Sequence, residues 1–172
     1  LVVVQNKLKW PSYSKYVIGS LFAIYAVMTM RQNYIWGKAT RFYPYILQYQ
    51  TTARVHNNLA MAYADEQKIE LAIQHYKKAI EVSDNYPQTH YNLARSYVAI
   101  DDTKSAITEL KTTLEMSANF GPAYPLLIQL LVVTDDLPSA RMYLEQFAEV
   151  YPSTPVQKEL EAIIARAEAS KE

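Results

Sequence analysis

The chain has 172 residues, a formal net charge of zero, 50% hydrophobic and 12% aromatic residues, and no cysteine. This length is enough for one domain of ordinary size. The lack of cysteine excludes disulfides, thiolate metal sites and a cysteine nucleophile, and it fits a reducing or an oxidising compartment equally well.

The zero net charge conceals two oppositely charged parts of the sequence. Residues 1–50 hold six of the 17 basic residues and no acid, so 11 basic residues remain against 17 acids, the first of which is Asp65. A basic N-terminal part facing anionic lipid headgroups is the natural interpretation, because each Lys or Arg near such a surface gains about 1 kcal/mol. We predict a basic juxtamembrane segment over residues 1–15. The first residue is Leu1 rather than Met, which favours a fragment of a longer protein.

Residues 16–30 form an apolar run without charge, bounded by Lys15 and Arg31. At about 1.5 Å per residue, this run alone is shorter than a hydrocarbon core of about 30 Å. Snorkelling basic side chains and aromatic residues at both ends extend it to Trp36. Because the run has almost no polar face, we predict a transmembrane helix over residues 16–36, with a buried or interfacial helix as the alternative. Gly19 and Ala23 form a small-xxx-small pair that would let another membrane helix approach.

Residues 37–51 are rich in tyrosine and contain one proline, Pro44. We predict a connecting helix here. Proline lacks a backbone N–H and clashes with the preceding turn, so Pro44 should kink or divide this helix.

A pattern of residues that recurs every 34 positions begins at Ala53. The first copy contains His56, Asn58, Leu59, Ala60, Tyr63, Ala72 and Tyr76, and the second contains His90, Asn92, Leu93, Ala94, Tyr97, Ala106 and Leu110. A third, more diverged copy contains Tyr124, Leu127, Leu131, Ala140, Leu144 and Pro152. This period and residue order resemble the tetratricopeptide repeat (TPR) family. The resemblance implies an all-α fold, a TPR α-solenoid of three helix-turn-helix repeats over residues 52–152, with a capping helix over residues 153–172 that ends polar.

The expected helix pairs cover residues 53–65 and 68–82, 87–99 and 103–116, and 121–133 and 137–150, with a last helix over 155–169. Small residues, such as Ala72 and Ala106, would let the helices of a pair cross closely. The acidic pairs Asp101-Asp102 and Asp135-Asp136 fall in the turns inside repeats two and three, where Asp caps the next helix.

The resemblance also implies where a partner would bind, because TPR solenoids present the first helix of each repeat along a groove. Stacked amides such as Asn58 and Asn92 offer donors and acceptors to the backbone of an extended peptide, although asparagine that simply faces water is an alternative. Leu126 makes the third repeat more apolar. The Lys pattern with which some TPR domains clamp a terminal carboxylate of chaperones is missing. The predicted groove residues are Arg54, Asn57, Asn58, Met61, Gln88, Tyr91, Asn92 and Arg95.

No pattern in the sequence predicts catalysis, a cofactor or a metal site. His56 and His90 occupy an early structural position of the first helix in each repeat, and we expect His75 to face solvent. Three glycines cannot form a glycine-rich phosphate loop, and there is no HExxH motif or nucleophile elbow. Basic and aromatic residues interleave at 31–49, but their position next to the apolar run favours lipid headgroups over nucleic acid.

A weaker resemblance covers residues 16–150, where an apolar helix, a Trp and TPRs follow one another as in bacterial transmembrane-and-TPR proteins similar to glycosyltransferases. Three hypotheses result. The first is a non-enzymatic, membrane-anchored TPR scaffold that binds a protein or extended peptide, as an accessory or assembly subunit of a membrane complex. Its location would be a bacterial inner membrane, single-pass, with periplasmic repeats. The second is the non-catalytic C-terminal TPR arm of a polytopic glycosyltransferase. The third is a soluble TPR adaptor.

Overall fold

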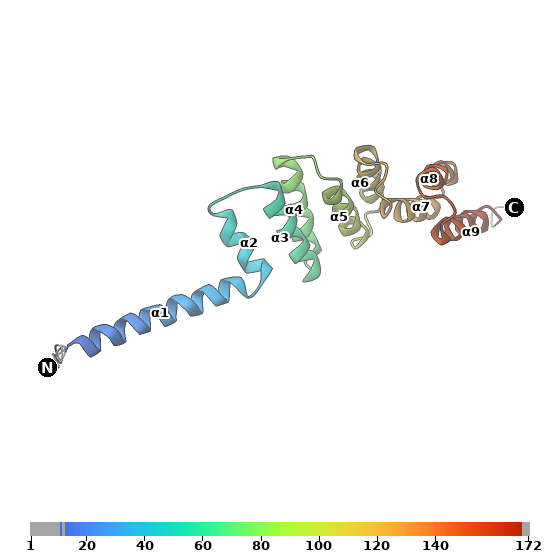
Figure 1. Ribbon diagram of the computed structural model, residues 1–172. Coiled ribbons are helices and arrows are strands. Elements are labelled where there is room, and N and C mark those ends of the chain that lie inside the picture. Colours follow the sequence, from blue (N-terminus) through green and yellow to red (C-terminus); the bar gives the residue numbers. More distant parts are fainter. Residues whose placement is uncertain (1–10, 12, 170–172) are drawn as a thin grey trace, which may run out of the picture. The chain divides into compact units, whose positions relative to one another are not determined.

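The computed structural model describes residue 11 and residues 13–169, and all the regular secondary structure in these residues is helical (Figure 1). Two helices come first, α1 (Ser14–Trp36) and α2 (Ala39–Leu47). The next six helices form three pairs and a last helix follows them: α3 (Ala53–Asp65) and α4 (Ile69–Val82), α5 (Pro87–Val98) and α6 (Thr103–Met116), α7 (Ala123–Val133) and α8 (Leu137–Val150), then α9 (Pro155–Ala169). The predicted helix bounds from residue 53 onward agree to within two residues.

The chain divides into two compact units, residues 1–42 and residues 43–172. The first unit contains α1, a helix of 23 residues with no buried side chain. Near its end, the Arg41 guanidinium lies 3.9 Å from the centre of the Tyr34 ring, and the Trp36 and Phe42 rings meet edge to face at 6.1 Å.

The predicted transmembrane helix over residues 16–36 is wrong, and so is a single-pass membrane location built on it. No helix in the described part of the chain is both long enough and apolar enough to cross a bilayer. The physical reason lies in the charges at either end of the apolar run. Lys15 and Arg31 leave only about 22 Å of uncharged helix at about 1.5 Å per residue, against a hydrocarbon core of about 30 Å. Of the segment predicted as basic and juxtamembrane, residues 1–10 and 12 lie outside the described residues.

Pro44 does not divide the connecting helix, whereas a kink there, the other predicted effect, remains a prediction. The helix α2 begins at Ala39, passes through Pro44 and ends at Leu47. Pro44 lies six positions into a nine-residue helix, so only one possible i to i−4 hydrogen bond, from residue 44 itself, is lost.

In the second unit, each helix of a pair packs on its partner, and each pair packs on the next (Figure 1). Ala72, Ala106 and Ala140 are completely buried at equivalent places in the second helices of the three pairs. Because alanine has a single methyl group, the helices of each pair can approach closely there. Larger side chains fill the remaining space: Leu59, Tyr76, Leu93, Leu110, Tyr124, Leu127 and Leu131, all less than 3% exposed.

Aspartate caps begin the second helices of repeats two and three, as predicted from the acidic pairs. The Asp102 carboxylate accepts a hydrogen bond from the Ser105 backbone N–H at 3.1 Å, and Asp136 accepts one from Ser139 at 3.2 Å. The first repeat has Lys68 at the corresponding position, and its side chain makes no capping hydrogen bond. This helix therefore lacks a stabilising element that the other two possess.

The helix α9 closes the second unit by packing on α7 and α8. It buries Leu160 and Ile164, while its outer face is exposed. The Arg141 Nε donates to the Glu168 carboxylate at 2.6 Å, which ties α8 to α9 at the surface. A terminal helix with one apolar and one polar face is what a solenoid needs at its end.

Candidate functional site

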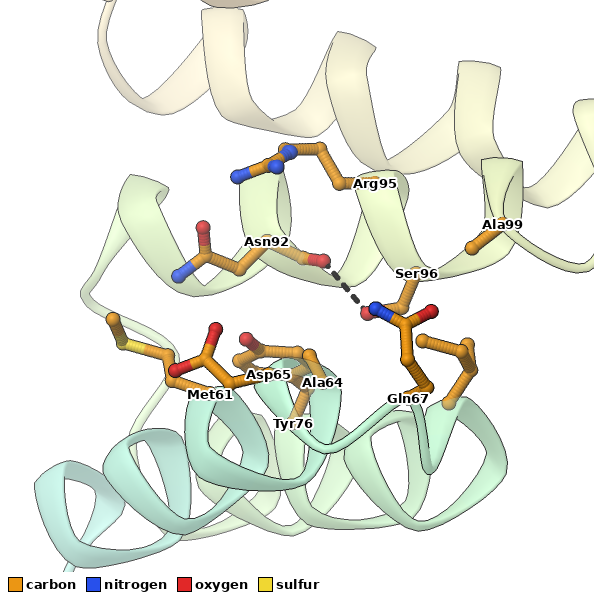
Figure 2. A pocket seen from close by; sticks show the side chains of 10 residues that line it. Met61, Ala64, Asp65, Gln67, Tyr76, Asn92, Arg95, Ser96 and Ala99 are labelled. Carbon is orange, nitrogen blue, oxygen red and sulfur yellow. Dashed lines mark hydrogen bonds between the residues drawn. The ribbon is translucent and has the colours of Figure 1, made fainter.

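Three cavities follow one another along the first helices of the repeats, and we call them together the groove. A cavity of about 150 Å³ lies between the N-terminal ends of α3 and α5. A cavity of about 420 Å³ lies between the C-terminal halves of the same helices, with Tyr76 of α4 in its wall (Figure 2). A third, of about 470 Å³, lies between α5 and α7. Since Arg95 lines both larger cavities, they adjoin at this residue.

The cavity between α3 and α5 has polar groups from two facing helices. Figure 2 shows Met61, Ala64 and Asp65 on α3 opposite Asn92 and Arg95 on α5. Burial raises the pKa of Tyr76 to about 12, so its hydroxyl stays protonated at physiological pH. A carboxylate, an amide, a guanidinium and a phenol thus line one cavity, together with Gln67.

Asn92 is the most informative residue of this cavity. Its side chain is 7% exposed, and its Oδ1 accepts a hydrogen bond from Gln88 Nε2 at 3.0 Å. Its Nδ2 is buried and has no hydrogen-bond partner among the described residues. A buried donor without an acceptor costs about 1–3 kcal/mol, so a carbonyl oxygen entering the cavity would remove that cost.

The groove changes character between its two larger cavities. The cavity between α5 and α7 is lined by Val98, Pro122, Pro125 and Leu126, together with Tyr91, Ala99 and Gln129. Arg95 is exposed and lies 6.0 Å from the centre of the Tyr91 ring. Its positive charge therefore lies between a polar cavity and a mainly apolar one.

Seven of the eight predicted groove residues line one of the three cavities. Arg54, Asn57 and Gln88 line the smallest, Met61 and Asn92 the one between α3 and α5, and Tyr91 and Arg95 the one between α5 and α7. Asn58 lines none of them; its Oδ1 lies 3.5 Å from Asn57 Nδ2. Asn57 in turn accepts a hydrogen bond from the Thr89 hydroxyl at 3.3 Å, which links α3 to α5. A role of these residues in binding a partner remains a prediction.

Sequence reasoning missed several residues of the groove. Tyr76, which the sequence identifies only as part of the repeat pattern, is buried and also lines the cavity between α3 and α5. Asp65 and Ser96 line the same cavity, and Pro122 and Pro125 line the next. The 34-residue period places Met61 and Arg95 at equivalent positions. It does not predict that Asp65, at the end of α3, lines the same cavity between α3 and α5.

The histidines do not all lie where the sequence indicates. His56 and His90 are buried, as a structural position predicts. His75, expected to face solvent, is half-buried, and its Nδ1 lies 3.0 Å from His56 Nδ1. The reason is that α3 and α4 cross closely at this level, so a side chain beside Tyr76 is directed into the crossing.

Gly19 and Ala23, predicted to contact another helix, lie on α1, where every residue is at least partly exposed. A Cβ on Gly19 would have no atom within 4 Å. A contact of this pair with a second helix remains untested.

Taken together, the paired and stacked helices define a helical repeat protein. A tetratricopeptide repeat family model matches residues 51–119, so this part of the chain is a tetratricopeptide repeat region. No curated protein sequence matches the chain. The weaker resemblance to glycosyltransferase-like proteins remains a prediction.

Solved structures of TPR domains are similar in fold. The first TPR domain of Spaghetti bound to an HSP90 peptide has a TM-score of 0.62 at 19% identity, over 69% of this chain and 94% of that one. The first TPR domain of the human RPAP3 protein has a TM-score of 0.61 at 21% identity, over 70% and 94%. A tetratricopeptide repeat protein from Parabacteroides merdae has a TM-score of 0.65 at 17% identity, over 69% and 46%.

Proposed function

We propose that this chain is a TPR adaptor that binds an extended segment of a protein partner in the groove along α3, α5 and α7. The unpartnered, buried Nδ2 of Asn92 carries the proposal, because a main-chain carbonyl of such a segment would accept its hydrogen bond. Domains of similar fold that were solved with a bound HSP90 or HSP70 peptide support peptide binding by this chain. Of the hypotheses drawn from the sequence, the adaptor fits better than the membrane-anchored scaffold.

The groove favours a particular chemistry in the partner. Arg95, exposed between two cavities, is complementary to an acidic side chain. The Pro122, Pro125 and Leu126 wall is complementary to an apolar side chain nearby. A segment with an acidic residue followed or preceded by an apolar one would satisfy both, with its backbone held at Asn92. That nucleic acid is not a partner stays a prediction.

The test is a selection of random linear peptides on the full chain, followed by affinity measurements on groove variants. Asn92→Ala should weaken the selected peptides about 2–10-fold, as expected for one lost hydrogen bond. Arg95→Ala should weaken acidic peptides by a larger factor, because a hydrogen bond to a charged group is worth about 1.5–3 kcal/mol.

Two surface variants provide matched controls. Asn85→Ala changes an exposed asparagine whose amide donates to the Ser83 hydroxyl at 3.1 Å, and Arg166→Ala changes an exposed arginine on α9. Both should leave peptide affinity unchanged. Peptides that bind all four variants equally well would contradict the groove proposal and direct attention to the tyrosine-rich residues 37–51.

A further inference from the structure

In the first two repeats, one pair of side chains joins the two helices at the same register. The 34-residue period relates His56 to a histidine and then a tyrosine, and it relates His75 to a glutamate and then a tyrosine. The chemistry of the pair thus differs from repeat to repeat at a constant place. The three pairs are His56 with His75, His90 with Glu109, and Tyr124 with Tyr143.

In the first repeat the pair consists of two histidines in direct contact. The two Nδ1 atoms are 3.0 Å apart, so one ring must donate an N–H to the lone pair of the other. His56 is 7% exposed, and the Tyr63 ring covers His75 with ring centres 5.5 Å apart. This hydrogen bond requires that at least one of the two rings is neutral, because two imidazoliums would offer only donors.

The charges around this pair do not favour protonation. Burial is the main cause that lowers the pKa of His56, and Lys78 lowers it further while Glu81 acts in the opposite direction. Burial also lowers the pKa of His75, and His56 and Lys78 contribute. Thus the folded first repeat takes up protons less readily than the unfolded chain does.

The ionisable groups on α5, which packs on both α3 and α4, have other partners. His90 contacts Asp84 and Glu109, and the Arg95 guanidinium acts on Tyr76 and the Tyr91 ring. The Tyr97 ring lies 5.7 Å from the Lys77 ammonium.

In the second repeat the same place favours the charged form. His90 Nδ1 lies 2.6 Å from a Glu109 oxygen, and its Nε2 lies 2.6 Å from an Asp84 oxygen. The hydrogen bond to Glu109 is the main cause that raises the pKa of His90. Two carboxylates therefore favour a protonated imidazole at the position where the first repeat has a pair that resists a second proton.

We propose that the His56–His75 contact is a proton-sensitive latch between α3 and α4, so that acid selectively loosens the first repeat and leaves the second closed. In the unfolded chain both histidines accept a proton, whereas the folded pair retains its hydrogen bond only with one proton at most. Stability of this repeat therefore falls as pH decreases through about 6.5, the ordinary pKa of histidine. A difference of one proton changes the opening equilibrium about tenfold per pH unit.

Amide hydrogen exchange on the full chain tests the latch. The measured exchange rates are divided by the intrinsic rates at each pH, which gives the local opening equilibrium of each helix. Between about pH 6.5 and pH 5.5, opening of α3 and α4 should increase by several-fold and up to about tenfold. Opening of α5 and α6 should not increase. Because the pH slopes are compared rather than the absolute protection, a lower baseline stability of a terminal repeat does not affect the result.

Two substitutions take their chemistry from the other repeats of this chain. His75→Glu places the second repeat's carboxylate beside His56, so acid should then no longer increase the opening of α3 and α4. His75→Tyr places the third repeat's residue beside His56. The opening of α3 and α4 should then depend on pH only as much as a single histidine requires.

Two results would overturn the latch. One is that, in the unmodified protein, opening of the first repeat increases with falling pH no more than opening of the second repeat does. The other is a steep slope that persists in both variants. The comparison within the unmodified protein decides the matter even where a variant fails to fold.

Discussion

The Tyr151 ring lies against Gly121 so closely that a Cβ on this glycine would be 3.0 Å from the Tyr151 Cζ. The ring is held in place from two sides. Its hydroxyl donates to the Asn119 carbonyl at 2.6 Å, and it packs on Phe147 with ring centres 5.3 Å apart. Residues 119–121 precede α7, and Tyr151 follows α8, so this contact joins the beginning and the end of the third repeat.

Gly121→Ala should therefore destabilise the repeats. The new methyl group must displace the Tyr151 ring or the turn before α7, and such overpacking costs about 1–3 kcal/mol, with the low end expected for a ring near the surface. Chemical denaturation measures the loss. Gly19→Ala is the control, because a Cβ there has no atom within 4 Å and should not change unfolding of the repeats.

The first repeat can be stabilised by giving it the cap that the others possess. Lys68 lies at the N-cap of α4, where a cation opposes the helix dipole, and its ammonium contacts the exposed Glu66 carboxylate at 2.7 Å. Lys68→Asp should stabilise the protein by about 0.5–1 kcal/mol, because aspartate accepts an N–H of the first turn. The measurement is the shift in the denaturation midpoint.

The reverse change in the second repeat tests the same interaction. Asp102→Ala removes the hydrogen bond from Ser105 and should cost about 0.5–2 kcal/mol. If Lys68→Asp leaves the midpoint unchanged while Asp102→Ala lowers it, the lack of a cap in the first repeat is compensated by other contacts of Lys68.

The repeats could be predicted from the sequence because their period fixes both the helices and the side chains between them. Ala72, predicted at a helix crossing, is completely buried, and Asp102, predicted as a cap, accepts the expected hydrogen bond. The period locates side chains along each helix, which is sufficient for the fold.

The period does not give the distances between helices, and the errors arise there. Asn58 and Asn92 are equivalent in sequence, yet of the two only Asn92 lines one of the three cavities and has a buried donor without a partner among the described residues. His75 contacts His56 because of how α3 crosses α4, which no property of α4 alone reveals. The prediction that the apolar run of α1 spans a membrane is wrong for a different reason. Lys15 and Arg31 limit the length of uncharged helix, and the prediction that snorkelling extends this length does not hold.

The completely buried alanines permit a test of the close helix crossings. Ala72→Leu or Ala106→Leu should destabilise the protein by about 1–3 kcal/mol, because three extra carbon atoms have no space at 0% exposure. Thermal melting detects the change. Ala162→Leu on the exposed face of α9 serves as the control and should have little effect. An unchanged melting temperature for both buried variants would mean that the helix pairs adjust freely.

The contact of Glu109 with His90 predicts a stability that depends on pH in a defined direction. Since the pKa of His90 is raised in the folded protein, the stability that the pair contributes is fully present below about pH 6.5 and disappears as pH rises through the folded value. Glu109→Gln removes the carboxylate that is the main cause of this shift. The loss of stability should therefore be larger at about pH 5.5 than at about pH 8.5, as chemical denaturation at both values would measure.

The variant His90→Gln supplies the matched control, because it removes the titrating group and retains a polar side chain. In this background, Glu109→Gln should cost nearly the same at both pH values. An equal loss at both pH values in the presence of His90 would contradict the assignment. It would mean that Glu109 stabilises α6 through packing or through Lys77, whose ammonium it also influences, and not through a charged histidine.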